Sequence, residues 1–429
     1  MPNRAKQFRY VGLDVTASTL TGHYQLDDLA FTETVTFDVD GDLREPGPRE
    51  IATLWYLVAG LSYFKAGAPE LVDLGDTPVT PEAVRFLTAA IREGLGEFAF
   101  RNQLWLGDVA VFGGVAATPR DHEVDPLRAL TPFGGGIDSV VSVRSLNPAI
   151  EQALFVMSPP SGTFAPLEAT AAVMALPIKR ATRQLDPQIT AKNPDFFNGH
   201  VPVTAMVTLL ACIAALAEDR GAVVMSNEHS ASAPNAMWDG LAINHQWSKS
   251  ANAEDLINDA VASYIGPRFK VASLLRDRSE LWVAERFATY RDVHHEFRSC
   301  NRAFHQDQAE RLVTWCGTCD KCLFINLVLA PFLSRDELSA IFGPTPPLTN
   351  PALEEQLRVL VGLGSDKKPF ECVGDPDECA VALETVAAMP AYADCDHLHH
   401  LARATANERT LAELLEPQGA SRVPASWLR

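Results

Sequence analysis

The sequence predicts an α/β protein built on a doubly wound parallel sheet, with an N-terminal α+β domain before it and a C-terminal helical region that carries clustered cysteines. Between residues 125 and 226, apolar runs of strand length alternate with helical patterns, which is typical of parallel sheets. Three consecutive glycines lie at the first strand-to-helix junction. At 429 residues, 47% of them hydrophobic, the chain is long enough for two or three domains. We expect these at residues 1–120, 121–295 and 296–429.

The first 120 residues contain no obvious chemical motif. Residues 8–39 show short alternating apolar runs with turn residues between them, which predict two or three strands joined by hairpins. Helical patterns follow at residues 50–64 and 81–93, the second with Pro81 suited to a first helical position. We expect this domain to pack against the rest of the chain or to shape a substrate site.

The central region predicts four parallel strands and the helices between them. Strands are expected at residues 127–133, 153–158, 178–185 and 222–226, and helices at 137–144, 166–175 and 201–217. Sheets of this kind bind ligands beyond the carboxyl ends of their strands. Functional side chains should therefore follow these strands directly.

The glycine turn is the strongest candidate for such a site. Gly134, Gly135 and Gly136 let bare backbone N–H groups approach a phosphate, and the following helix N-terminus adds a partial positive charge. Asp138 and Ser139 fall in the first helical turn, where a carboxylate can face Mg²⁺ and a hydroxyl can bond a phosphate oxygen. The alternative, a tight turn that binds nothing, is disfavoured by Asp138 and Ser139 behind the glycines.

Three further strand ends are selected by the same rule. Ser158 follows the second strand and Asp186 the third, while Asn227, Glu228 and His229 follow the fourth. The last group can bind a metal, a ribose or a reacting group. An ordinary polar turn with helix-capping side chains is the alternative.

A polar loop follows at residues 244–250. Lys249 could face phosphate or carboxylate there, and His245 could move protons. Solvent exposure is the commoner state for a lone lysine or histidine.

The cysteines predict a metal site in the C-terminal region. Cys316, Cys319 and Cys322 are spaced by three residues around a glycine, and the upstream Cys300 completes a set of four thiolate ligands. We expect a structural Zn²⁺; an iron–sulfur cluster and buried free thiols are the alternatives. Residues 394–400 are also rich in Asp, Cys and His, but consecutive residues on a helix do not face one another.

Charge and hydropathy restrict the class of protein. A formal net charge of −18 argues against a nucleic-acid enzyme, which needs a basic surface. No apolar segment typical of a signal peptide follows the polar N-terminus. The longest apolar run, 201–217, reads as a buried helix and not a membrane span. We expect a cytoplasmic protein without a membrane partner.

The glycine turn resembles the phosphate loop of the PP-loop ATP pyrophosphatases, whose signature is Ser-Gly-Gly-x-Asp-Ser. Gly135, Gly136, Asp138 and Ser139 match it, and Gly134 stands where the family usually has serine. The resemblance implies the PP-loop fold, binding of ATP and Mg²⁺, and cleavage of ATP to AMP and pyrophosphate. Together with the four cysteines it is also similar to the preQ0 synthases, which are zinc-bearing members of that superfamily.

A closer resemblance covers most of the chain. The segments 134–139, 226–231, 248–250, 297–301 and 315–322 look like those of the UDP-N-acetylmuramoyl-L-alanyl-L-glutamate epimerases of bacterial peptidoglycan synthesis. This resemblance implies adenylation of a substrate carboxylate by ATP, followed by inversion of the glutamate α-carbon, without pyridoxal phosphate.

Inversion needs proton-transfer groups on two faces of the α-carbon. We expect His229 as a base and Glu228 on Mg²⁺, with His245, Lys249 and an unligated Cys300 as further candidates. A preQ0-synthase-like ligase acting on another carboxylate, or a zinc-stabilised ATP-binding module without catalysis, are the alternatives.

Overall fold

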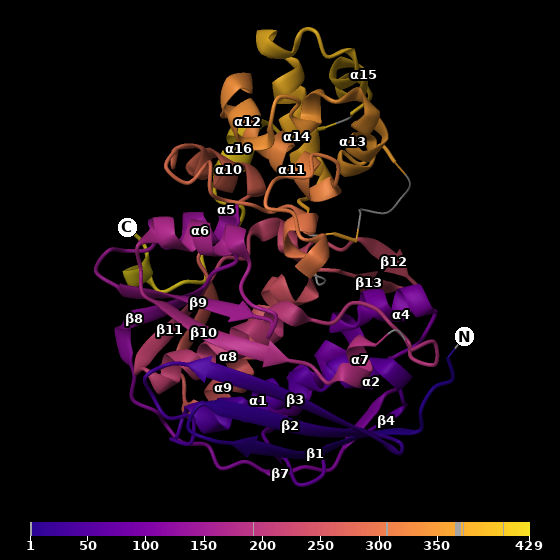
Figure 1. The fold of residues 1–429 in the computed structure, drawn as a ribbon, viewed down its shortest axis with the longest axis vertical. Coiled ribbons are helices and arrows are strands. Elements are labelled where there is room, and N and C mark those ends of the chain that lie inside the picture. Colours follow the sequence, from indigo (N-terminus) through magenta and orange to yellow (C-terminus); the bar gives the residue numbers. More distant parts are fainter. Residues whose placement is uncertain (1, 192, 306–307, 365–369, 372, 406) are drawn as a thin grey trace.

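The computed structural model describes residues 2–191, 193–305, 308–364, 370–371, 373–405 and 407–429. It is a mixed α/β structure organised around one ten-stranded, mostly parallel sheet, with strand order β14-β11-β8-β9-β10-β3-β2-β1-β4-β6. Figure 1 shows the N-terminal strands at one end of the molecule and the C-terminal helices at the other, with the parallel strands between them.

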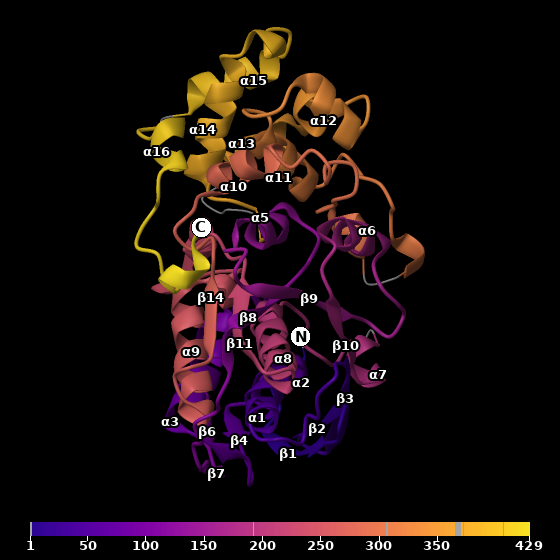
Figure 2. The same ribbon diagram turned by 90° about the vertical axis from the view of Figure 1, so that its left-hand side faces the viewer.

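The parallel half of the sheet has the predicted doubly wound arrangement. Its strands are β8 (Asp125–Pro132), β9 (Glu151–Ser158), β10 (Ile178–Gln184), β11 (Arg220–Met225) and β14 (Lys270–Ser273). Helices α5 (Ile137–Ser145) and α6 (Ala165–Met174) cover one face, while α8 (Val203–Ala217) and α9 (Ala251–Ile265) cover the other (Figure 2). The chain runs from β8 to β9 and β10 on one side and then crosses to β11 on the other. The crevice for a ligand is therefore expected at the carboxyl end of β8, where the strand order reverses.

The N-terminal strands extend the same sheet. Strands β1 (Gln7–Val15), β2 (Thr19–Leu26) and β3 (Leu29–Asp38) form the predicted antiparallel hairpins. β3 pairs antiparallel with β10, and β1 pairs parallel with β4 (Leu71–Asp73), which pairs with β6 (Ala110–Phe112). The sheet thus continues across residue 120 without a break.

The helix predicted at residues 50–64 is divided in two. Helix α1 (Pro48–Ala59) ends at Gly60, and α2 (Leu61–Gly67) follows. A Cβ atom at Gly60 would lie 2.7 Å from the ring of Tyr10, so glycine is required for the close approach of helix and strand. The helix predicted at 81–93 also changes form, because α3 (Pro81–Ala89) continues as a π-helical turn at residues 90–94.

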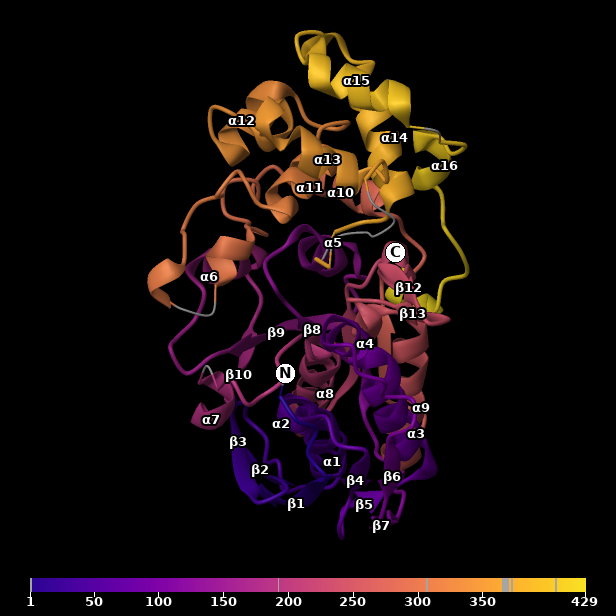
Figure 3. The same cartoon turned by 90° about the vertical axis from the view of Figure 1, so that its right-hand side faces the viewer.

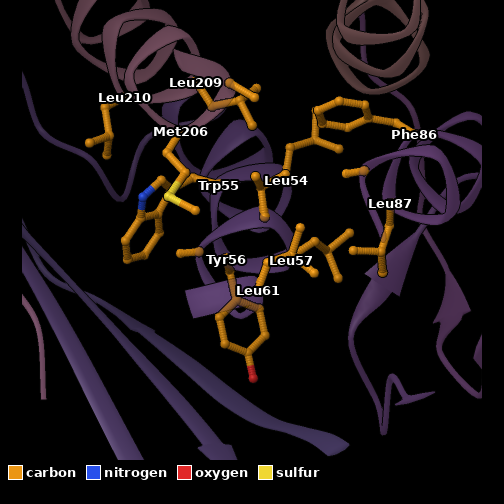
Figure 4. Close-up of a cluster of buried hydrophobic side chains, with 14 of the residues drawn as sticks. Leu54, Trp55, Tyr56, Leu57, Leu61, Phe86, Leu87, Met206, Leu209 and Leu210 are labelled. Carbon is orange, nitrogen blue, oxygen red and sulfur yellow. The ribbon is translucent and has the colours of Figure 1, made fainter. Parts of the chain in front are cut away.

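The largest core lies between the N-terminal strands and helices α1, α3, α8 and α9. Figure 4 shows Trp55 and Leu57 of α1 with Phe86 of α3 and with Met206 and Leu209 of α8. All five side chains are at most 1% exposed. This core holds α8, the apolar run at 201–217, as a buried helix. No helix in the described part of the chain has the length and apolarity needed to cross a membrane.

The C-terminal helices stand above α5 (Figure 3). Their core includes Phe133, Ile137 and Val140 of the glycine turn and α5, together with Leu281 and Phe324. The chain then returns to the sheet, where Trp427 packs with Ala129 and Leu146. These helices are α10 (Glu280–Ala288), α11 (Asp320–Leu329), α12 (Arg335–Phe342), α13 (Glu354–Leu360), α14 (Pro376–Ala387), α15 (Asp396–Ala404) and α16 (Leu411–Leu415).

The remaining elements are short. They are α4 (Gly96–Asn102), α7 (Pro187–Thr190), β5 (Pro78–Val79), β7 (Val115–Ala116), β12 (Ala236–Trp238) and β13 (Leu241–Ile243). β5 pairs with β7 and β12 pairs with β13, each in a two-stranded sheet of its own.

Candidate functional site

A pocket of about 490 Å³ lies at the carboxyl ends of β8, β9 and β11, where the strand order reverses. Its wall contains both apolar side chains and polar or charged ones. The apolar side chains come from β9, β11, α6, α8 and two loops: Phe133, Phe155, Met157, Leu167, Val203, Val207, Met225 and Phe304. The charged and polar ones come from α5, α8, α11 and four loops: Asp138, Ser139, Thr204, Ser226, Asn227, Lys249, Arg298, Ser299, Asn301, Lys321 and Glu371.

The glycine turn forms one edge of this pocket. Gly135 has a φ of +74°, and a Cβ atom there would also lie 3.2 Å from Leu167 Cα. Gly136 is the N-cap residue of α5 and provides no side-chain cap for the first helical N–H groups. A Cβ on Gly136 would lie 3.0 Å from Ser299 Oγ. Gly135 therefore requires glycine, whereas a side chain at Gly136 would displace the Ser299 hydroxyl. The first N–H groups of α5 lie without a side-chain cap beside Asp138.

Ser139 has a local hydrogen bond as well as a place in the pocket wall. Its Oγ donates to the Gly136 carbonyl oxygen at 3.0 Å. The hydroxyl of Ser226, at the end of β11, is buried and has no hydrogen-bond partner in the described part of the chain. A ligand in the pocket could supply that partner.

Of the candidate residues after β11, one lines the pocket and two do not. Asn227 lines the pocket, where its Nδ2 donates to Ser273 Oγ at 3.1 Å. Glu228 and His229 are not among the described residues that line it. The backbone oxygen of Glu228 accepts from Arg276, and the amide of His229 donates to the Arg278 carbonyl. Burial and the nearby Arg276 lower the pKa of His229.

Ser158 and Asp186 are likewise not brought to the pocket wall in the described chain. Ser158 is buried at the end of β9, and its Oγ has no partner among the described residues. Asp186 caps α7 through an oxygen that accepts from the Gln188 amide at 2.9 Å, and its other oxygen accepts from the Thr32 amide at 2.9 Å. Asp186 therefore joins the end of β10 to β3.

The loop after β13 places its two candidate residues differently. Lys249 lines the pocket, and its Nζ donates to Gln246 Oε1 at 3.0 Å. The Nδ1 atom of His245 lies 2.5 Å from Glu97 Oε2 on α4. His245 also lies against His200, with ring centroids 4.3 Å apart.

The four predicted cysteines converge. The sulfur atoms of Cys300, Cys316, Cys319 and Cys322 all lie within 4.8 Å of one another and form no disulfide. The Sγ–Sγ distances are 3.4 Å for Cys319–Cys322 and 3.7 Å for Cys316–Cys322. A tetrahedron of thiolates around Zn²⁺ has sulfur separations of about 3.8 Å, from a Zn–S bond of about 2.3 Å. The cluster is thus able to bind a metal ion.

The metal-like cluster at residues 394–400 does not assemble. No group of three ligands in this stretch comes together among the described residues. His397 Nε2 instead lies 3.0 Å from the Leu348 carbonyl oxygen.

Residues beside the cysteines were missed by the sequence reasoning. Arg298 precedes Cys300 by two residues, and Lys321 lies between Cys319 and Cys322, yet both line the pocket. The Nε atom of Arg298 is buried without a partner in the described chain, and burial lowers the pKa of this guanidinium. The sequence signal for both is their position within two residues of the clustered cysteines.

A group of buried carboxyls behind the pocket was also missed. Glu280, at the start of α10, is 4% exposed, and Glu378 of α14 is 2% exposed. Burial, then the charges of Glu228 and Asp138, raise the pKa of Glu280 well above its ordinary value. Burial and Asp375 raise the pKa of Glu378 to about 8. Helical periodicity hides both residues, because a glutamate in a first helical turn usually faces solvent.

The comparison with known protein families agrees with the layout of the chain. The model of the MurL N-terminal domain matches residues 1–274, and that of the MurL C-terminal domain matches residues 296–415. The chain belongs to the MurL family. The glycine turn and Lys249 lie in the part matched by the MurL N-terminal domain, and the four cysteines lie in the part matched by the C-terminal domain.

Similar curated proteins are named UDP-N-acetyl-alpha-D-muramoyl-L-alanyl-L-glutamate epimerase. The protein from Salinispora tropica is 37% identical over 375 residues, which cover 85% of this chain and 80% of the relative. Those from a Micromonospora strain and from Xanthomonas oryzae are 35% and 33% identical and cover 93% and 91% of this chain, and 90% and 87% of the relatives. No solved structure matches significantly.

Proposed function

We propose that this MurL-family chain inverts the terminal L-glutamate of UDP-N-acetylmuramoyl-L-alanyl-L-glutamate to D-glutamate in peptidoglycan synthesis, with consumption of ATP. The names of the relatives support the substrate. The observation that supports the use of ATP is the pocket at the strand-order reversal, whose wall contains a glycine turn, a helix N-terminus without a side-chain cap, and the cationic side chains of Arg298 and Lys321.

The mixed apolar and charged lining of the pocket fits a nucleoside triphosphate. The apolar part, with Phe155, Met157 and Leu167, suits a purine ring. Arg298 and Lys321 provide positive charge for phosphates in the same pocket as the glycine turn. Asp138 would hold Mg²⁺ there.

The reaction begins at the α-carboxylate of the substrate glutamate, which is attached to the carbon that is inverted. A carboxylate oxygen attacks the α-phosphorus of ATP, pyrophosphate leaves, and a mixed acyl–AMP anhydride forms. The α-proton becomes more acidic, because the adjacent carbonyl no longer carries a negative charge. After proton removal and return on the opposite face, water attacks the anhydride carbonyl and AMP leaves. The sum is substrate, ATP and water giving epimer, AMP and pyrophosphate.

Lys249 is our first choice for a proton-transfer group at the α-carbon. It lines the pocket, which supports direct contact with substrate, whereas Glu228, His229 and His245 are not among the described lining residues. Those three side chains then serve to position the loops around Lys249 and Asn227. Cys300 is assigned to the metal cluster and not to proton transfer.

Zn²⁺ is the metal proposed for the four cysteines. All four ligand positions are filled by sulfur, which is the pattern of a structural zinc site and leaves no open position for chemistry. Its role would be to hold Arg298 and Lys321 against the pocket.

The test is incubation with ATP, Mg²⁺ and the UDP-muramoyl dipeptide ending in L-glutamate. We expect AMP and pyrophosphate, together with D-glutamate after acid hydrolysis of the product. AMP formed only with a deazaguanine acid would instead indicate a preQ0-synthase-like ligase. Binding of ATP without AMP formation on any of these substrates would indicate a module without catalysis.

A further inference from the structure

We propose that Glu97, His200 and His245 form a second metal site, for a Zn²⁺-like transition-metal dication, separate from the four cysteines. One ligand atom from each of the three residues lies within 4.8 Å of the other two. The residues come from three separate parts of the chain: α4, the segment before α8, and the loop after β13. Figure 3 shows α4 beside β12 and β13, which accounts for this convergence.

Two of the three residues, Glu97 and His245, are held in place by neighbouring contacts. Glu97 is 5% exposed, and its Oε1 accepts from Arg101 Nε at 2.6 Å. Its Oε2 lies 2.5 Å from His245 Nδ1, as described above. The backbone amide of His245 donates to Asn235 Oδ1 at 2.8 Å. Metal-binding carboxylates are commonly oriented by hydrogen bonds from neighbouring side chains. Arg101 makes such a bond to one oxygen of Glu97, and the other oxygen faces the imidazole of His245.

Two imidazoles and one carboxylate are the ligand set of a three-coordinate protein site that keeps an open position. Such sites bind Zn²⁺ or similar ions and leave a coordination place for water or a substrate oxygen. Imidazole and carboxylate groups bind a metal ion in their deprotonated forms.

The surrounding charges decide the class of metal. Lys65 and Lys249 lie near His200. Arg101 adds a third cation. A hard dication such as Mg²⁺, held mainly by negative charge, is disfavoured in these surroundings. Imidazole nitrogens bind Zn²⁺ through coordinate bonds, so its binding depends less on negative charge in the site.

The site lies next to the pocket without being part of its wall. His245 and Lys249 belong to one short loop, and Trp247 of that loop is fixed by a bond from its Nε1 to Glu93 Oε2 at 2.9 Å. A metal bound to His245 would therefore fix the loop that carries Lys249. This inference does not depend on the proposed epimerase activity.

The experiment counts metal on the full chain. The purified protein is stripped with a chelator, dialysed against Zn²⁺ with Mg²⁺ in large excess, and analysed for bound zinc. The wild type is compared with His200→Asn, His245→Asn and Cys319→Ser. The matched control is His23→Asn, since His23 is a partly exposed histidine on β2 that pairs with Asp14.

We expect the two cluster variants to bind one zinc fewer per chain than the wild type and than His23→Asn. They should keep the zinc held by the cysteines, which also shows that they are folded, whereas Cys319→Ser should keep the zinc at the histidines. X-ray absorption of zinc in Cys319→Ser should then show nitrogen and oxygen neighbours only. Equal zinc content in the wild type, His200→Asn and His245→Asn would overturn the proposal.

Discussion

Gly134, Gly135 and Gly136 have different roles in the turn between β8 and α5. Gly134 is open, with no atom within 4 Å of a Cβ atom placed there, and its φ is not positive. Gly135 has a left-handed backbone conformation. A Cβ atom at Gly136 would lie 3.0 Å from Ser299 Oγ. The family signature resembled here has serine at the first of these positions, which agrees with the space at Gly134.

Gly135→Ala should destabilise the chain by about 1–2 kcal/mol, because alanine in the left-handed region costs that much and its methyl group would press on Leu167. Gly134→Ala, the matched control, should change the free energy of unfolding by less than about 0.5 kcal/mol. Urea unfolding of both variants measures this difference. Equal stabilities would show that the backbone at Gly135 is not left-handed.

Asp138→Asn should lower the rate of AMP formation at least about 100-fold, since removal of one group that stabilises transferred charge costs that much. The fold should persist, because asparagine has the same shape. Asp28→Asn, an exposed change in the turn between β2 and β3, is the control and should leave the rate unchanged. Turnover of Asp138→Asn within a few-fold of the wild type would remove Asp138 from the site.

Lys249→Gln should abolish proton exchange at the glutamate α-carbon, while His229→Asn should retain most of it, because Lys249 lines the pocket and His229 does not among the described residues. Deuterium incorporation from deuterated water, followed by mass spectrometry, separates the two. The reverse result would return the role of base to His229.

Helices α10 and α14 meet through a carboxyl group that is buried. Glu378 Oε2 accepts from the backbone amide of Glu280 at 2.7 Å, so a side chain of α14 caps the N-terminus of α10. Burial raises the pKa of Glu378 to about 8. This contact joins the helices that carry the C-terminal core to the region behind the pocket.

The free energy of unfolding that the buried Glu378 contributes should fall as pH rises. Between pH 4.5 and 8, the unfolded glutamate is ionised while the folded one keeps its proton, so unfolding releases a proton and becomes easier at higher pH. Glu378→Gln, which cannot ionise, should gain about 3 kcal/mol relative to the wild type between pH 5 and pH 8. Unfolding free energies of both proteins at several pH values test this. A difference that is independent of pH would mean that Glu378 is ionised in the folded state.

The alternation of strands and helices was readable from sequence because it depends on local periodicity. The strands at 127–133, 153–158 and 178–185 were predicted within two residues of β8, β9 and β10. The joining of β3 to β10 was not, since it depends on contacts between distant residues. Arg183 lies in β10, whose sequence contains several charged residues. Its Nε atom lies 2.7 Å from Oε1 of Glu33, which is fully buried. No local pattern indicates that such a pair lies inside.

The candidate site was predicted in part for the same reason. The glycine turn, Asn227 and the cysteines follow from strand ends and spacing. Arg298 and Lys321 reach the pocket only because the cysteines fold back over α5, and the contact of Glu97 with His245 links residues 148 positions apart.

The whole molecule is organised with the pocket between the sheet and the C-terminal helices. The glycine turn and α5 share their core with α10 and α11, and the cysteine cluster begins α11. The two matched MurL domains thus each provide part of the pocket wall.

Loss of the proposed zinc should therefore weaken ATP binding. Cys319→Ser should raise the ATP concentration for half-maximal AMP formation at least about tenfold, through displacement of Arg298 and Lys321, each worth about 1 kcal/mol or more as a charged donor. Cys395→Ser is the control, because Cys395 lies outside the cluster at the N-cap of α15, a position that suits serine. An unchanged ATP dependence in Cys319→Ser would separate the cluster from the pocket.

In the proposed mechanism, adenylation of the carboxylate comes before proton exchange at the α-carbon. The direct measurement is α-deuterium incorporation in deuterated water, with the UDP-muramoyl dipeptide and either ATP or an ATP analogue with a methylene bridge between the α- and β-phosphates. We predict deuterium at the α-carbon with ATP and none with the analogue, which cannot release pyrophosphate. Exchange at the same rate with the analogue, or without any nucleotide, would show that proton exchange does not require adenylation.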